Sequence, residues 1–167
     1  MARQYIVPMS NVTIASTNTL VALSPVNPGP VLEIMRCWAS QSGSATSAQQ
    51  GVRIVEQVNS TAAISVVGSA ATPQPVMNND PASKISGGAI CSTATATVNC
   101  TSEGTGTKST YYPDAFNVLN GWLWVPTPNE THMMAPFGTS FSYGIFLPTS
   151  PGSTANWNAG ISFRELG

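Results

Sequence analysis

Apolar and polar residues alternate along most of this chain, which is the pattern of β-strands. From Ile90 to Val98, threonines alternate with alanine and valine, as in a strand with one polar face. Gly160–Leu166 alternates in the same way, whereas Val31–Ala39 has large apolar residues at both parities. The last pattern predicts a strand that is buried on both faces of its sheet.

Segments rich in proline and glycine separate these runs. Residues 25–30 contain three prolines and residues 148–152 contain two, which predicts turns and loops because proline removes a backbone donor from a sheet. No segment shows a sustained helical period, and only residues 45–50 and 60–66 are short helical candidates. We therefore expect an all-β fold. Within this class we expect a two-sheet antiparallel sandwich of the jelly-roll or Greek-key type, with about eight strands and long Pro/Gly-rich loops.

The length of 167 residues suits one domain, so we expect residues 1–167 to form a single β-sandwich domain. Residues 1–7, before Pro8, are a candidate N-terminal arm. Residues 60–84 are the least regular stretch and contain three prolines. A loop of this length either contacts a partner or simply crosses over the sandwich.

The surface is expected to be poor in charge. Charged residues make up 8% of the sequence and apolar residues 42%, whereas charged residues average about 25% in globular proteins. Because interface cores exclude Lys and Glu, this depletion favours a protein that partners cover. The net charge of −1 and the six scattered basic residues offer no stripe for nucleic-acid phosphates. Neither a signal-peptide pattern nor the roughly 20 apolar residues of a membrane span is present, so we expect no membrane contact.

Residues suited to catalysis are sparse. The seven carboxylates are isolated in the sequence, and nothing selects the facing pair that a glycosidase needs. His132 is the only histidine and is in principle a general base, but a structural or solvent-facing role is the simpler interpretation. Motifs of nucleophilic, phosphate-binding or dinucleotide-binding sites are missing. We expect no enzyme activity, no catalytic residue, no metal site and no cofactor.

The three cysteines are Cys37, Cys91 and Cys100, and they cannot all be paired within one chain. Cys91 and Cys100 flank the Thr/Ala alternation, so a disulfide between them would close a hairpin. A reducing cytoplasm would instead keep both as thiols. Both alternatives stay open at this point.

Trp122 and Trp124 share one face of a predicted strand, and Leu123 and Val125 share the other. If Leu123 and Val125 point to the core, the tryptophans form an outer aromatic patch for a protein or sugar ligand. The opposite parity places the tryptophans in the core. The sequence alone leaves both arrangements open.

Several short motifs are spread over most of the chain. They are Met1–Tyr5 with Asn11–Ile14, the strand carrying Leu32, Arg36, Trp38 and Gln41, Thr72–Pro75 with Asp80–Ser83, Phe116 and Asn117 leading into Gly121–Trp124, and the C-terminal Phe163–Gly167. Together they resemble the small virion structural proteins of tailed bacteriophages, in particular capsid decoration (cement or auxiliary) proteins.

The resemblance implies a non-enzymatic protein of the capsid surface, made in the host cytoplasm. Its implied partners are the major capsid protein and copies of itself, most often in a homotrimer. No set of functional residues comes with the resemblance. The candidate interface residues instead follow from the irregular, charge-poor segments and the tryptophan face: Arg3, Tyr5, Pro73, Pro75, Asn78, Trp122 and Trp124. A tail-associated or receptor/carbohydrate-binding jelly-roll module is the alternative.

Overall fold

The computed structural model describes most of the chain, in several stretches. These are residues 2–24, 30–43, 47–59, 67–87, 95–102, 106–128, 130, 132–134, 141–152 and 154–167. For residues 67, 86, 87, 95–97, 101 and 102 only the backbone is described. The helical candidate 60–66 and the cysteine Cys91 therefore lie outside the described residues.

Strands make up the regular structure of the described part, which contains no helix. Residues 49 and 50 of the other helical candidate begin a strand. The strands are β1 (Arg3–Ile14), β2 (Asn18–Ser24), β3 (Val31–Ser42), β4 (Gln49–Val58), β5 (Val67–Ala71), β6 (Gln74–Pro75), β7 (Ser86–Gly87), β8 (Thr95–Ser102), β9 (Thr107–Asn117), β10 (Trp122–Trp124), β11 (His132–Met134), β12 (Phe141–Leu147) and β13 (Ala155–Leu166).

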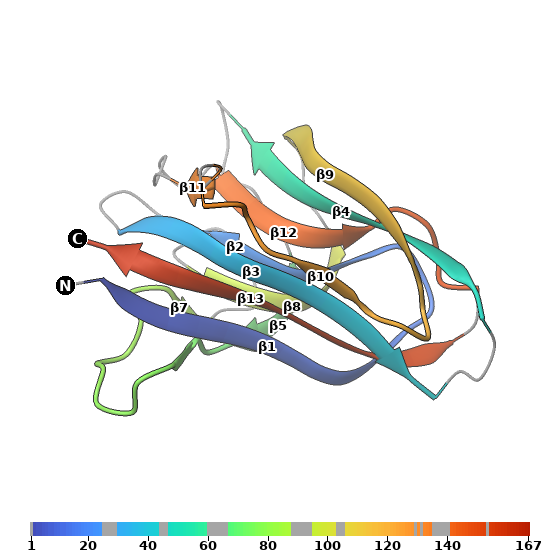
Figure 1. Cartoon of the computed structure of the whole chain (residues 1–167), viewed down its shortest axis with the longest axis horizontal. Helices are drawn as coiled ribbons and strands as arrows, with labels where there is room; N and C mark the ends of the chain where they lie inside the picture. Colours follow the sequence, from blue (N-terminus) through green and yellow to red (C-terminus); the bar gives the residue numbers. More distant parts are fainter. Residues whose placement is uncertain are drawn as a thin grey trace.

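The strands form two sheets, which confirms the predicted two-sheet sandwich (Figure 1). The first sheet has the order β10-β3-β13-β1-β6, with β11 also beside β3, and the second has the order β5-β8-β2-β12-β4-β9, with β7 beside β8. All pairs are antiparallel except β7 with β8. Eight strand positions have the arrangement of a jelly roll. In one sheet these are β1, β13, β3 and β10/β11, and they face β2, β12, β4 and β9 of the other.

The five additional strands come from two departures from that plan. One strand position is divided between β10, which pairs with Cys37–Ala39, and β11, which pairs with Leu32–Ile34. The strands β5 to β8 all lie between β4 and β9 in sequence and widen the sheets at one edge, where β8 pairs with β2 and β6 pairs with β1. The irregular stretch 60–84 is thus partly a sheet extension.

The core lies between the two sheets and is made of large side chains from both. The fully buried ones are Trp157, Tyr5, Tyr143, Phe163, Ile14, Leu20, Leu23, Leu32, Ile34, Ile54 and Ile85. The prediction that Val31–Ala39 is buried on both faces holds only in part, because β3 alternates between buried and partly exposed positions. Its outward positions carry residues such as Trp38 and Arg36, which cover the sheet from outside.

Residues 3–7 are not a free N-terminal arm, which corrects that interpretation of the sequence. They form the first part of β1, which pairs with β13 from Arg3↔Glu165 to Ile14↔Ala155. Tyr5 and Val7 are fully buried. Pro8 does not end the strand because β6 reaches only Tyr5 and Ile6, so the missing N–H of Pro8 falls beyond that pairing.

Candidate functional site

Five of the predicted interface residues meet at the end of the sandwich where the described chain begins and ends. Tyr5 pairs with Pro75 across β1 and β6, and the Arg3 side chain hydrogen-bonds the Tyr5 hydroxyl. Pro73 is buried, Pro75 is partly buried and Asn78 is exposed in the turn that follows β6. The N-terminal residues and the proline-rich stretch are therefore one surface. Tyr5 lies beneath this surface, since it is fully buried, and its hydroxyl supports the surface from inside through the bond to Pro81.

Hydrogen bonds anchor this turn on both sides. Before it, the Val76 amide donates to the Gln4 carbonyl at 3.0 Å. After it, the Tyr5 hydroxyl donates to the Pro81 carbonyl at 3.0 Å. The buried carboxylate of Glu165 then accepts from the Ser83 hydroxyl at 2.5 Å and from the Lys84 amide at 3.0 Å. The chain between these anchors is thus tied at both ends to β1 and β13.

The anchored turn presents apolar side chains to solvent. Met77 is 68% exposed and Val76 is 48% exposed, and the Asp80 amide closes the turn on the Met77 carbonyl at 2.9 Å. We call residues 76–80 the apolar turn. It projects from the sandwich beside the two chain ends (Figure 1).

The structure puts Trp122 and Trp124 on the inner side of the first sheet. Trp122 is 7% exposed, and its indole N–H donates to Asp114 at 3.0 Å. The Trp124 ring lies 4.7 Å from the Tyr112 ring, against the core. The arrangement with both tryptophans toward the core is thus the correct one, and the buried Trp122 leaves little surface for a partner. Outward positions belong to Leu123 and Val125, which are exposed.

A second feature, missed in the sequence, is a groove at the edge where β11 of the first sheet meets β4 and β9 of the second. The His132 Nε2 lies 2.8 Å from Glu56 Oε1, and both side chains are mostly buried. The Tyr111 hydroxyl donates to the same carboxylate. The groove has a volume of about 440 Å³ and is lined by Glu56, Val58, Tyr111, His132, Met133, Met134 and Phe141.

A β-bulge positions Tyr111 in this groove. Ile54 pairs with Tyr112 and Val55 pairs with Thr110, so Tyr111 is the extra residue of β9. Bulges commonly redirect a side chain in this way. The His132 ring is then held between two tyrosines, 4.9 Å from the ring of Tyr111 and 5.1 Å from that of Tyr143.

These contacts shift the titration of the groove. Burial raises the pKa of Glu56, but the hydrogen bonds from His132 and Tyr111 and the charge of His132 together outweigh it, so the pKa is lowered. The hydrogen bond to Glu56, followed by burial, raises the pKa of Tyr111. At neutral pH the groove therefore holds an ionised carboxylate and a neutral phenol.

The titratable groups in and behind the groove include one carboxylate and one thiol. Among the described lining residues Glu56 is the only carboxylate, so the facing pair of a glycosidase is not formed there. The Cys37 thiol lies 4.0 Å from the Tyr143 hydroxyl in the core, and burial raises the pKa of this thiol to about 12. A neutral, buried thiol is a poor nucleophile.

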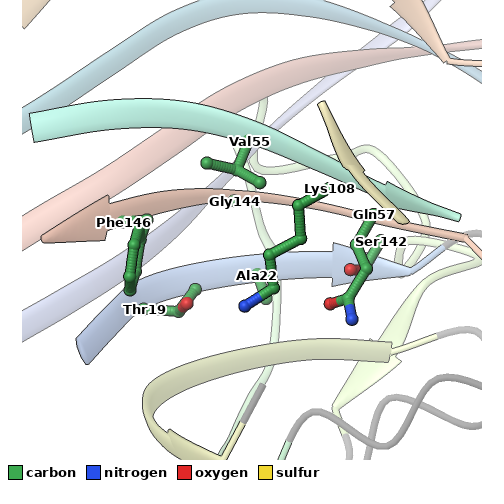
Figure 2. A pocket seen from close by; sticks show the side chains of 8 residues that line it. All are labelled: Thr19, Ala22, Val55, Gln57, Lys108, Ser142, Gly144 and Phe146. Carbon is green, nitrogen blue, oxygen red and sulfur yellow. The ribbon is translucent and has the colours of Figure 1, made fainter. Parts of the chain in front are cut away.

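A small depression on the outer face of the second sheet is too small for an organic ligand. Figure 2 shows the side chains that line it, from β2, β4, β9 and β12. Its volume of about 20 Å³ is enough for one water molecule. The described residues contain no cluster of three or more His, Cys, Asp or Glu that suits a metal ion, and within the same residues no helix is long and apolar enough to cross a membrane.

Comparisons with protein-family models, curated proteins and solved structures find no match to this chain.

Proposed function

We propose that this chain is a non-enzymatic structural protein of a bacteriophage virion, a decoration protein that binds and stabilises the major capsid shell. The observation that carries the proposal is the apolar turn, in which Val76 and Met77 are exposed on a segment that Tyr5 and Glu165 hold in place. Exposed apolar side chains on a rigid support are typical of protein contacts.

The hydrogen bonds that anchor the apolar turn favour binding. A loop that is ordered only on binding loses conformational entropy, whereas one already fixed by hydrogen bonds does not. Full burial of a Val or Met side chain stabilises a complex by roughly 1.5–3 kcal/mol. A modest contact of this kind, repeated over many copies, stabilises an assembled shell by mass action.

The low charge of the chain agrees with this role. With charged residues at 8% of the sequence and a net charge of −1, most of the surface is neutral and can be covered without desolvating ions. We propose the major capsid protein and further copies of this chain, in a trimer, as the partners. We propose neither nucleic acid nor a membrane as a binding partner.

Purified capsids that lack the protein provide the test. We expect wild-type protein to fill them and V76S/M77S to bind at least about tenfold more weakly, because half of the burial energy of two side chains exceeds 1.4 kcal/mol. Leu119→Ser is the matched control, since Leu119 is also exposed, at 51%, but lies near Ala48 and Ser40 at the opposite end of the sandwich. Equal occupancy by all three proteins would refute the proposed contact, and sedimentation analysis tests the trimer.

A tail-associated receptor- or carbohydrate-binding module is the second candidate, and Trp38 favours it. This partly exposed indole lies on the outer face of the first sheet against Gly160, with the Arg36 guanidinium 5.0 Å from its centroid. Aromatic faces stack on sugar rings, and a sugar here would take the place of the Arg36 guanidinium over the ring. Glycan-array binding that Trp38→Ala abolishes, without capsid occupancy, would favour this second function.

A further inference from the structure

We propose that the groove lined by Glu56, Tyr111 and His132 binds an organic ammonium group, that is, an amine cation on a short aliphatic chain. The proposal is independent of the capsid function and rests on the shape, charge and hydrogen bonding of the groove. Free alkylamines and lysine side chains of proteins carry this same group.

The size and walls of the groove fit a small, mostly apolar ligand. Its volume of about 440 Å³ lies within the range of roughly 300–1,000 Å³ that is usual for ligand pockets. Val58, Met133, Met134 and Phe141 form apolar walls. Methionine thioethers adapt their shape to a ligand, and Met133, at 52% exposed, lies at the rim.

The charge of the groove favours a cation. Among the described lining residues Glu56 is the only acidic one and neither Lys nor Arg is present, so only the His132 imidazole bonded to it can offset its charge. A carboxylate has roughly four acceptor positions, of which His132 and Tyr111 occupy two. The remaining positions can accept from an ammonium group, and the electron-rich ring of Tyr111 beside the carboxylate adds cation–π attraction.

The same features disfavour a sugar or an anion. Among the described lining residues the polar groups are those of Glu56, Tyr111 and His132, and these are already hydrogen-bonded to one another. A polyhydroxylated ligand would leave several of its hydroxyls without partners, which is costly in a partly buried site. An anion would be repelled by the Glu56 carboxylate.

The carboxylate is also fixed before a ligand arrives. His132 comes from β11 in the first sheet and Glu56 from β4 in the second, so their contact at 2.8 Å ties the two sheets together at the groove. The side chains of His132 and Glu56 are only 13% and 12% exposed. Little side-chain entropy is therefore lost when a ligand binds.

Methyl NMR of protein labelled at the methionine methyl groups is the direct test. We expect n-butylammonium to shift the Met133 and Met134 signals with a Kd on the order of 1–10 mM, a reasonable value for so small a ligand. The neutral isostere 1-butanol and the anion butyrate should bind at least tenfold more weakly. A capped Gly-Lys-Gly peptide, compared with its norleucine analogue, shows whether a lysine side chain can also enter.

Two variants test whether Glu56 is responsible for butylammonium binding. Glu56→Gln keeps an acceptor for His132 and should weaken butylammonium binding at least tenfold, while Glu130→Gln, which removes the same charge from an exposed residue, should leave it unchanged. If Glu56→Gln does not fold, Met133→Lys places an ammonium at the exposed rim and should compete with the added ligand. Equal binding of the ammonium and the alcohol, no binding of either, or a sugar that shifts the same signals more strongly would each overturn the proposal.

Discussion

Replacing Gly160 with alanine places a methyl group where the indole of Trp38 now lies. A Cβ atom at residue 160 would stand 2.1 Å from Cζ2, 2.4 Å from Cη2 and 2.7 Å from Cε2 of that ring, whereas ordinary contacts begin at 3.4 Å. The nearest ring atom would have to move by about 1.3 Å, which is 3.4 minus 2.1. Trp38 is partly exposed, so the ring can move outward, but it then loses its packing on β13.

The expected cost is about 1–3 kcal/mol, the usual range for overpacking, and includes about 0.5–1 kcal/mol if the Arg36 stacking contact is lost. In a Trp38→Ala background the methyl group meets no ring. There the same Gly160→Ala change should be neutral or stabilising by about 0.5–1 kcal/mol, because alanine restricts the unfolded chain. The two substitutions should therefore be coupled by about 1–4 kcal/mol, which is the cost in the wild type plus any gain in the Trp38→Ala background.

Urea unfolding of the wild type, both single variants and the double variant measures this coupling. Gly152→Ala is the control, since a Cβ there meets nothing within 4 Å, and it should change the free energy of unfolding little. A coupling energy below about 0.5 kcal/mol, the level seen for independent sites, would refute the close packing of the Trp38 ring against the Gly160 backbone.

Two further predictions concern ionisable groups. The pKa of Glu56 is lowered in the folded protein, so its ionised form stabilises the fold fully above the ordinary glutamate value of about 4.3 and progressively less as the pH falls through the lower, folded value. The free energy of unfolding of the wild type minus that of Glu56→Gln should thus shrink below about pH 4.3, and a difference that grows in acid would contradict this sign. Because burial raises the pKa of Cys37 to about 12, iodoacetamide should leave Cys37 unmodified in the native protein and alkylate it in denaturant, as peptide mass mapping can show.

Local patterns in the sequence predict the fold class well because strand pairing here depends on a regular alternation. The strand β13, with Ile161 and Phe163 buried and Arg164 partly exposed, follows directly from that alternation. The parity of β10 does not, since Trp122 and Leu123 are both apolar and either face can be buried. Only the pairing of Trp122 with Ala39 and the hydrogen bond to Asp114 decide it.

The sites depend on contacts between residues far apart in the sequence, which no local pattern encodes. Glu56 and His132 are 76 positions apart, and Ser83 and Glu165 are 82 apart. Sequence reasoning considered His132 alone and found no partner for it. It also treated the N-terminal residues and the proline-rich stretch as separate irregular segments, whereas Tyr5 and Pro75 are neighbours in one sheet.

The groove lies where the strand position beside β3 is divided between β10 and β11. A continuous strand beside β3 would place backbone pairs along the whole edge, but in the described part of the chain β10 and β11 pair with residues 37–39 and 32–34 alone. His132 begins β11 and reaches across to Glu56, and the bulge at Tyr111 opens the facing edge of the second sheet. Two irregularities in opposite sheets thus coincide at one edge. Because bulges and broken edge strands weaken pairing and are common next to binding sites, their coincidence at the ionised carboxylate is a further reason to look for a ligand there.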